Sequence, residues 1–496
     1  MGKKFLIKLF LIICISNFFL FLLSCTSDKN SDQDIILKVG QSKISVEDFR
    51  NLYELDPSFP GIRKGTDGLR EFAEKITDKI LCEKLAQEEG VVENIPFKRR
   101  LNYKRNETII RSFYEKKVKN KVQVSESEIK SAYLRMSVKL HVKHLFAPDK
   151  LQAENLYRSL EAGVPFDTLA SKVFAGIQPE QGGPDLGMIS WGDLNPSLED
   201  VVYNLKPGEY SKPVSSPWGY HILLVTNREQ NLMITDSEYR EKHDQIERKL
   251  RKRKEELAAG DYLKNYLDPF HIKVKKEAFS KIIQLLHIDF DEPAIQFQKD
   301  KYLSDQDIEF LRNNLKNQLD DPFMVSNKNK WSIGEFIDKI DSIPWDKRPR
   351  ISSAQKLKDD IGILIRNEFL LNEALKNGIN NETKIDSTMH AYTQELAYNY
   401  YLRRSYQKFE LPSEIAEYYK KRYDKNFVPD KIPDGILPGM NTPENYKLYY
   451  SERALHQQLI SHFRNINIQI NDELIAKEAE KIDWEKPVRM FIFPEN

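Results

Sequence analysis

Two kinds of hydrophobic spacing alternate along this chain. In the first, apolar residues return every three or four positions and charged residues fill the opposite face, which predicts amphipathic helices. In the second, apolar and polar residues alternate over short runs such as Val138–Phe146 and Tyr220–Val225, which predicts strands. The mixture predicts an α+β chain whose larger part is helical. The helical spacing covers residues 68–90, 98–122, 126–136 and 236–267.

The helical pattern occurs twice. Each copy begins with a serine followed three residues later by an acid, Asp48 in the first copy and Glu335 in the second, a spacing typical of a capped helix start. Each copy also carries an amphipathic helix that is closed by a glycine, Gly90 or Gly378, as left-handed helix caps require. These landmarks recur at a nearly constant offset, which indicates a duplication. They are Ile44–Phe49 with Trp331–Phe336, Leu81–Val91 with Phe369–Ile379, and Ser127–Tyr133 with Ser413–Tyr419.

The two copies differ after the last landmark. The first copy continues into a segment with its own strands and glycine-rich turns, whereas the second passes through the short Pro/Gly-rich connector Val428–Met440. Both copies then end in a helix and a strand-like tail, Phe270–Val274 in the first and Ile466–Ile470 in the second. The sequence therefore predicts a duplicated helical module with a further domain inserted into the first copy only.

The amino-terminal residues resemble the signal peptide of a bacterial lipoprotein. Three lysines lie within the first eight residues, an apolar run comes next, and Leu22-Leu23-Ser24 precedes Cys25. The resemblance implies cleavage before Cys25, lipidation of this cysteine, and a flexible tether over Thr26–Asp32. An uncleaved transmembrane anchor is the alternative, because the apolar run is nearly long enough to span a bilayer. We expect a lipid-anchored protein of the bacterial cell envelope, on the periplasmic face of a membrane.

The three cysteines permit no internal disulfide bond in the mature chain. Cys14 would leave with the signal peptide and Cys25 would carry lipid. Cys82 lies at an apolar position of a predicted helix, where we expect a small buried residue and not a reactive thiol.

Charge and histidine spacing argue against several partners. The formal net charge is +1, and the basic stretches Lys104–Lys121 and Arg248–Lys254 lack the interleaved aromatic residues of single-stranded nucleic-acid sites. We favour a solvated helix face for both stretches, with acidic lipid headgroups or acidic clients as the alternative. His141 and His144 face opposite sides of a strand, so they do not form a metal-ligand pair. We expect no metal, no cofactor and no nucleic-acid partner.

Two histidines lie on the apolar faces of the predicted strands. His144 shares a face with Val142 and Phe146, and His221 shares one with Leu223 and Val225. Either histidine by itself would be interpreted as a core residue. Two further motifs, Gln181–Gly192 and Pro213–Ile222, accompany them, and the order of all these features resembles the parvulin-type peptidyl-prolyl isomerases.

This resemblance covers about a fifth of the chain and implies both a fold and a site. The fold would be a four-stranded antiparallel sheet wrapped by helices. His144 and His221 would be the paired histidines of the sheet floor, with Ser216 as the hydroxyl residue linked to them. Leu186, Leu194 and Leu198 would line the pocket for the proline ring, and Asn195 would lie at its rim.

The flanking helical modules resemble those of SurA/PrsA-like chaperones. The resemblance implies a membrane-anchored foldase that binds unfolded or partly folded exported and outer-membrane proteins and isomerises their X–Pro bonds. Two departures are present: Gly176 stands where parvulins usually carry an acid or a cysteine, and Leu194 and Leu198 replace methionine and phenylalanine. A non-enzymatic periplasmic chaperone, or holdase, with a weakened or inactive parvulin domain is therefore the alternative.

The expected domain boundaries come from these patterns. They are a signal peptide over residues 1–24, a lipidated tether over 25–34, an N-terminal helical chaperone module over 35–137, the parvulin domain over 138–229, a returning helix and strand of the first module over 230–285, a second helical module over 286–425, and a connector with a returning C-terminal helix and strand over 426–496.

Overall fold

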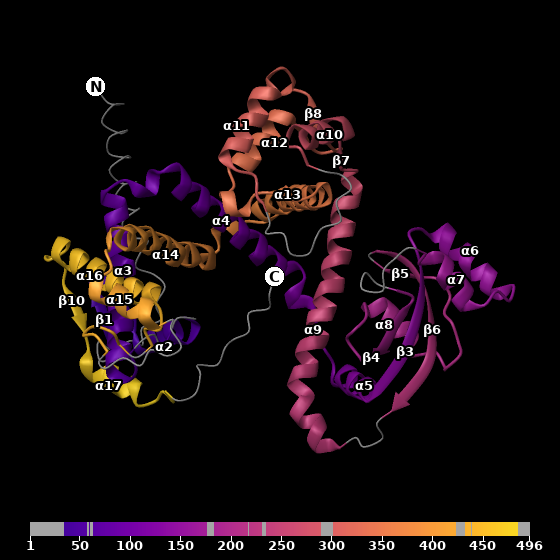
Figure 1. The fold of residues 1–496 in the computed structure, drawn as a ribbon, viewed down its shortest axis with the longest axis horizontal. Coiled ribbons are helices and arrows are strands. Elements are labelled where there is room, and N and C mark those ends of the chain that lie inside the picture. Colours follow the sequence, from indigo (N-terminus) through magenta and orange to yellow (C-terminus); the bar gives the residue numbers. More distant parts are fainter. Residues whose placement is uncertain are drawn as a thin grey trace, which may run out of the picture. The chain divides into compact units, whose positions relative to one another are not determined.

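In the computed structural model the chain forms two compact units (Figure 1). The first comprises Met1–Asn106, Ser342–Pro344 and Asn381–Asn496, and the second comprises Glu107–Asp341 and Trp345–Asn380. The predicted signal peptide, Cys25 and Gly176 lie outside the residues that the structure describes. The described residues are 34–56, 59, 63–175, 183–216, 218–230, 235–288, 301–422, 432–437 and 439–484.

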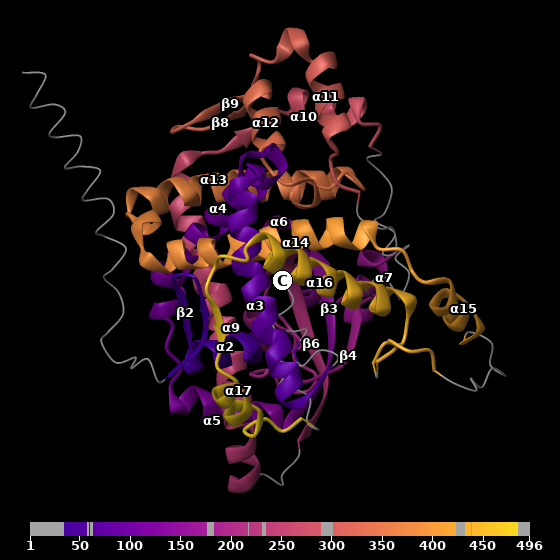
Figure 2. The same ribbon diagram turned by 90° about the vertical axis from the view of Figure 1, so that its left-hand side faces the viewer.

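The first unit is a helical module with a small sheet. Helix α3 lies at its centre, and α14, α16 and α17 pack against it (Figures 1 and 2). Cys82 is fully buried in this core, as expected, and burial raises the pKa of its thiol. The strands are β1 (Ile35–Val39), β2 (Ser42–Ser45) and β10 (Ile468–Ile470). The helices are α2 (Val46–Leu55), α3 (Gly65–Glu88), the start of α4 (Ile95–Lys117), α14 (Thr383–Lys408), α15 (Ser413–Arg422), α16 (Pro443–His462) and α17 (Asp472–Ala479).

The second unit carries a four-stranded antiparallel sheet in the order β4-β3-β6-β5. One face packs on α6 and α7 through Leu145 and Ile222, and the other packs on α5, α8 and α9 through Leu140 and Leu223. The strands are β3 (Val138–Ala147), β4 (Asp185–Ile189), β5 (Val214–Ser216) and β6 (Gly219–Gln230). The helices are α5 (Glu126–Met136), α6 (Lys150–Glu161), α7 (Phe166–Val173), α8 (Pro196–Val202) and α9 (Asp236–Leu267).

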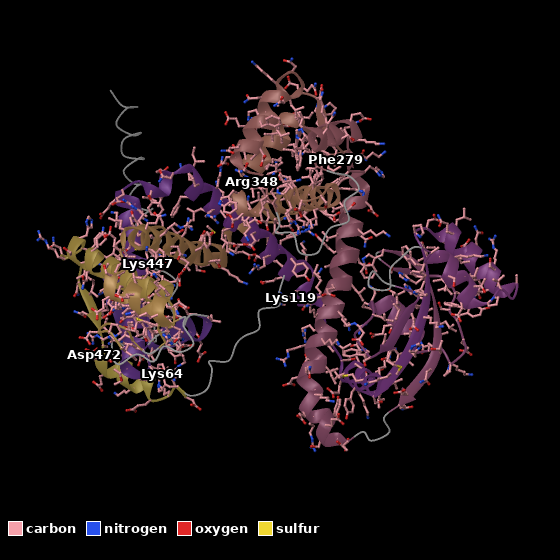
Figure 3. All side chains as sticks on the ribbon, viewed as in Figure 1. Lys64, Lys119, Phe279, Arg348, Lys447 and Asp472 are labelled. Atoms are coloured by element: carbon pink, nitrogen blue, oxygen red, sulfur yellow. The ribbon has the colours of Figure 1, made fainter. Side chains whose placement is uncertain are left out.

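A second helical module completes this unit. Its core includes the fully buried Phe323 and Ile337. The buried guanidinium of Arg348, labelled in Figure 3, donates to the Asp305 carboxylate at 2.7 Å and to the Leu303 carbonyl at 3.3 Å. Its elements are β7 (Lys273–Val274), α10 (Lys276–Leu285), α11 (Asp305–Asn314), β8 (Pro322–Val325), β9 (Lys330–Ser332), α12 (Ile333–Asp341) and α13 (Ala354–Lys376).

The duplication is visible in matched local contacts. The Asp48 N–H donates to the Ser45 hydroxyl and the Glu335 N–H donates to the Ser332 hydroxyl, each at 3.1 Å. Gly90 and Gly378 both take left-handed φ angles, 68° and 72°. The prediction of an α+β chain, in which a four-stranded sheet is inserted into a duplicated helical module, is confirmed.

The two copies exchange their last strands. Strand β10, from the end of the second copy, pairs with β1 of the first copy, and β7, from the end of the first copy, pairs with β8 of the second. The order of elements along the sequence instead predicts that each returning strand belongs to its own copy. Because the two hairpins and the two tails are related in sequence, each hairpin edge fits either tail, and hydrophobic alternation does not decide between the pairings.

Candidate functional site

The two central strands of the four-stranded sheet bring His144 and His221 together. His144 on β3 is opposite Leu223, and His221 on β6 is opposite Phe146, so all four side chains lie on one face. The imidazole rings are nearly parallel, with centroids 5.4 Å apart. Strand alternation thus places on the sheet a pair that the sequence separates by 77 positions.

The hydrogen bonds around this pair define one chain of donors. The Gly183 carbonyl only accepts, so His144 donates to it from Nε2 at 3.1 Å. Nδ1 of His144 is then an acceptor for Nδ1–H of His221, also at 3.1 Å. Nε2 of His221 accepts in turn from the Ser216 hydroxyl at 2.9 Å. The chain Ser216→His221→His144→Gly183 holds both imidazoles in single neutral tautomers.

Burial keeps both imidazoles neutral. Desolvation lowers the pKa of His144, against a smaller opposing effect of the Gly183 carbonyl. Desolvation, followed by the neighbouring His144, lowers the pKa of His221 to about 4. At neutral pH neither ring carries charge, so the pair serves as an ordered dipolar network and not as a titrating acid–base couple.

The strand turn beside Ser216 depends on glycine. Gly219 has a φ of 145°, and a Cβ atom there would lie 2.6 Å from the Ala147 carbonyl oxygen. The backbone of β6 can therefore approach β3 closely enough to place His221 beside the Ser216 hydroxyl. The adjacent Trp218 N–H donates to the same hydroxyl oxygen at 3.2 Å.

Two phenylalanines flank the histidines. The Phe146 ring lies 5.3 Å from the His221 ring, and the Phe174 ring lies 5.1 Å from the His144 ring, centroid to centroid. Strand alternation predicts Phe146 on this face. Sequence reasoning missed Phe174; the available signal was an apolar residue that directly follows the amphipathic helix α7.

The predicted pocket residues, three leucines and Asn195, lie outside the hydrogen-bond chain of the histidines. Leu186, Leu194 and Leu198 all belong to or pack against one apolar cluster on the α8 side of the sheet, and Leu198 is only 4% exposed. Leu186 comes shortly after the Gly183 carbonyl that accepts from His144. The Asn195 side chain caps α8 by accepting the Ser197 N–H at 3.1 Å. The structure thus unites Ser216 with the histidines and places the leucines in one cluster.

Helix α9 holds this domain through its basic residues. Arg253 forms an ion pair at 2.7 Å with Glu199, which is fully buried, and Lys249 donates to the Trp191 carbonyl at 3.2 Å. Both cations also lie over the Trp191 ring. The sequence pattern favours a solvated face for this stretch, but two of its cations, Lys249 and Arg253, contact the isomerase domain.

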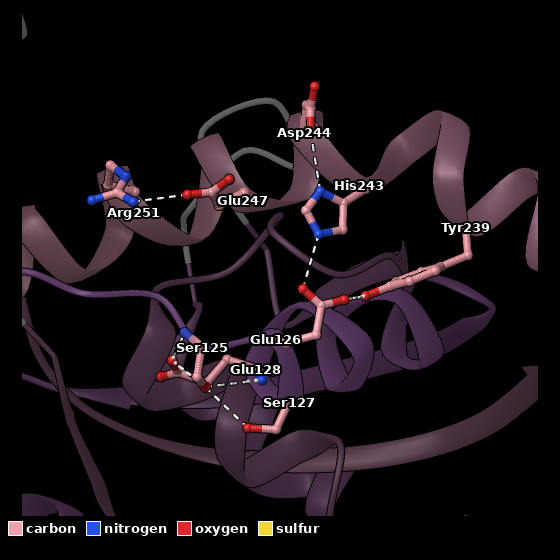
Figure 4. Close-up of polar contacts among 9 residues, drawn as sticks. All are labelled: Ser125, Glu126, Ser127, Glu128, Tyr239, His243, Asp244, Glu247 and Arg251. Atoms are coloured by element: carbon pink, nitrogen blue, oxygen red, sulfur yellow. Dashed lines mark hydrogen bonds and ion pairs between the residues drawn. The ribbon is translucent and has the colours of Figure 1, made fainter.

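One group among the described residues has ligand atoms spaced closely enough for a metal ion: His243, Asp244 and Glu247 on α9. Figure 4 shows that hydrogen bonds already engage both His243 nitrogens, Nε2 with Glu126 at 3.0 Å and Nδ1 with Asp244 at 3.1 Å. The same two carboxylates raise the pKa of His243. Tyr239 also bonds to Glu126. The group therefore forms a polar junction between α5 and α9.

The fold and the paired histidines define a class of protein. Residues 147–227 match the Rotamase family, described as the PPIC-type PPIASE domain. The chain thus carries a parvulin-type peptidyl-prolyl cis–trans isomerase domain and is an enzyme of that type.

The wider similarity is to foldases. The chain is 25% identical to "Foldase protein PrsA" of Geobacillus sp., an alignment covering 54% of this chain and 91% of that protein. It is 31% identical to "Foldase protein PrsA" of Halalkalibacterium halodurans, over 33% of this chain and 48% of that relative. A solved peptidylprolyl isomerase (PrsA) from Bacillus anthracis matches with a TM-score of 0.25 and 21% identity, covering 44% of this chain and 89% of that one. The family match and the two sequence relatives make the chain PrsA-like and support a foldase and isomerase function.

The neutral histidines give the domain a definite pH dependence. The unfolded chain binds a proton at His221 below about pH 6.5, whereas the folded protein does so only below about pH 4. The unfolded state therefore binds more protons within this window, and the free energy of unfolding falls by about 3 kcal/mol as pH falls through it. Urea unfolding at a series of pH values measures this. His221→Gln, whose amide does not titrate, should show a shallower decline; an equal decline would contradict the assignment.

Proposed function

We propose that the chain is a membrane-anchored foldase that binds unfolded exported proteins and catalyses cis–trans isomerisation of their X–Pro bonds. The observation that carries this proposal is the neutral chain from Ser216 through His221 and His144 to the Gly183 carbonyl. It supplies an ordered polar site in which both imidazoles are neutral.

Rotation about an X–Pro bond needs no covalent step. The barrier arises from amide resonance, which is lost when the bond twists. An enzyme accelerates rotation by binding the twisted amide more tightly than either planar form. In this proposal Leu186, Leu194 and Leu198 hold the proline ring, Asn195 marks the rim, and the histidines with Ser216 shape the polar floor. Phe146 and Phe174 keep that floor dry.

The membrane anchor in this proposal is lipid attached to Cys25. Its support is the leader, which ends in Leu-Leu-Ser-Cys. In the described part of the chain, no helix has the length and apolar character needed to cross a bilayer. The partners would be unfolded or partly folded exported and outer-membrane proteins, met on the periplasmic face of a membrane in the cell envelope.

A groove in the first unit favours holdase activity as a second function. Its volume is about 1050 Å³, and α14 contributes Tyr392, Tyr400 and Tyr406 to its lining. Ile95 and Leu448, exposed by 66% and 43%, also line it. Exposed apolar residues gathered in a groove mark binding surfaces, and tyrosines offer apolar area with a polar tip. This groove would hold client segments independently of isomerisation.

A matched pair of variants tests the groove. Leu448→Ser removes an exposed groove side chain, whereas Leu375→Ser removes one that is 41% exposed and lies outside the groove. We expect Leu448→Ser to weaken binding of a reduced, unfolded model protein by about tenfold, because the variant loses the contact of one leucine that becomes buried on binding. Leu375→Ser should bind as the wild type does. Equal effects of the two changes would remove the groove from the proposal, and isomerisation of a proline tetrapeptide should stay unchanged in both.

A further inference from the structure

Strand β10 (Ile468–Ile470) is an edge of the β10-β1-β2 sheet in the first unit (Figure 1). Among the described residues, β1 is its only strand partner. The Asn471 N–H donates to β1 at 2.9 Å, and the Asn467 carbonyl accepts from the turn after β1 at 2.8 Å. In an antiparallel ladder alternate residues face the partner. Ile468 and Ile470 therefore direct their backbone N–H and C=O groups to the outer edge.

A cleft of about 400 Å³ lies beside this edge. Ile466, Ile468 and Ile470 line it at alternate positions, and α3 and α16 supply the opposite walls, including Ile460. Arg464 also lines the cleft; its side chain is exposed and makes no ion pair within the described residues. Asp472, labelled in Figure 3, begins α17 directly after the strand. The outer edge is thus flanked by apolar side chains and an available cation.

The related edge strand in the second unit is protected. Strand β7 and the residue after it carry Lys273 and Lys275, both exposed, and lysines on an edge oppose addition of another strand. The corresponding residues after Ile468 are Gln469, Ile470 and Asn471, which are uncharged. The edge strands β7 and β10 thus have a common origin, but only β7 carries lysines that oppose the addition of another strand.

We propose that β10 is a docking strand for unfolded clients. The occupant is an extended client segment whose apolar residues alternate, so that it pairs with the outward groups of Ile468 and Ile470 and places its side chains in the cleft. Arg464 selects segments that are neutral or acidic at the facing position and disfavours basic ones. The proposal rests on the proposed binding of unfolded proteins and names the class of segment bound.

The test uses the complete chain and two synthetic peptides. One is a fluorescent peptide in which isoleucine and threonine alternate; the other is the same peptide N-methylated at its isoleucines, which removes the N–H groups of the edge that would pair with β10 while its isoleucines face the cleft. We expect the methylated peptide to bind about tenfold more weakly, for two lost hydrogen bonds. Ile468→Pro removes an outward N–H without touching the bonds to β1. It should weaken binding of the first peptide, whereas Ile468→Val should not.

A second variant guards against misfolding. Gln469→Lys changes an exposed side chain to the residue found in β7 and should also weaken binding, with unchanged thermal unfolding. Equal binding of both peptides, or unchanged binding by a folded Ile468→Pro protein, would overturn the proposal. So would amides of Ile468 and Ile470 already protected from hydrogen exchange in the free protein, because the edge would then be covered by this chain or a second copy. A wild-type protein without isomerase activity would refute the proposed isomerase function. The peptide-binding results would still decide whether β10 is a docking strand.

Discussion

His221→Leu is expected to lower kcat/KM for X–Pro isomerisation by about tenfold to a hundredfold. The change removes the side chain that joins the Ser216 hydroxyl to Nδ1 of His144, so the donor chain that fixes both neutral tautomers is lost. His144 then keeps its hydrogen bond to the Gly183 carbonyl but no longer has His221 as a donor. A chymotrypsin-coupled assay with a proline tetrapeptide measures the effect.

A conservative variant separates polarity from packing. His221→Gln can accept from Ser216 and donate to His144, so it should recover part of the activity that His221→Leu loses. Both variants should suppress aggregation of an unfolded protein as the wild type does, because the proposed client groove belongs to the other unit. If both retain full isomerisation, the histidine chain is not part of the site; if the wild type shows none, the holdase alternative holds.

The sequence predicts the histidine pair only through the resemblance to parvulins. Alternation groups His144 with Val142 and Phe146, and His221 with Leu223 and Val225. Both faces of the sheet are apolar, so alternation alone does not decide that the two histidines lie on the same one. The acceptor at the end of the donor chain is a backbone carbonyl, that of Gly183, which residue identity does not reveal. Phe174 contacts His144 because the end of α7 lies beside β3, and this packing is not visible in the sequence.

Other features could not be predicted because their partners are remote. The basic stretch of α9 is equally compatible with a solvated face until Glu199 and Trp191 are placed against it. The exchange of β7 and β10 between copies has the same origin: related hairpins and related tails satisfy the pattern in either pairing. Local spacing predicts elements and faces, whereas the choice between equivalent long-range partners needs the fold.

Arg253→Met is expected to have the largest effect on stability, lowering the free energy of unfolding by about 3–5 kcal/mol. Glu199 is fully buried, and Arg253 is its cationic partner at 2.7 Å; its other oxygen accepts the Gly192 N–H at 2.5 Å. Without Arg253 the buried carboxylate group loses its cationic partner. Urea unfolding measures the loss.

Two further variants identify the cause. Arg248→Met removes an exposed cation from the same basic stretch. Among the residues that the structure describes, Arg248 bonds only to the Asp244 carbonyl one turn away, so the change should cost less than about 0.5 kcal/mol. In the double variant Arg253→Met with Glu199→Gln, the buried group is neutral, and part of the lost stability should return. If Arg253→Met and Arg248→Met cost the same, the contact with Glu199 does not hold the isomerase domain on α9. A large loss with Arg253→Met that Glu199→Gln relieves would instead show that the buried carboxylate makes the domain depend on this helix.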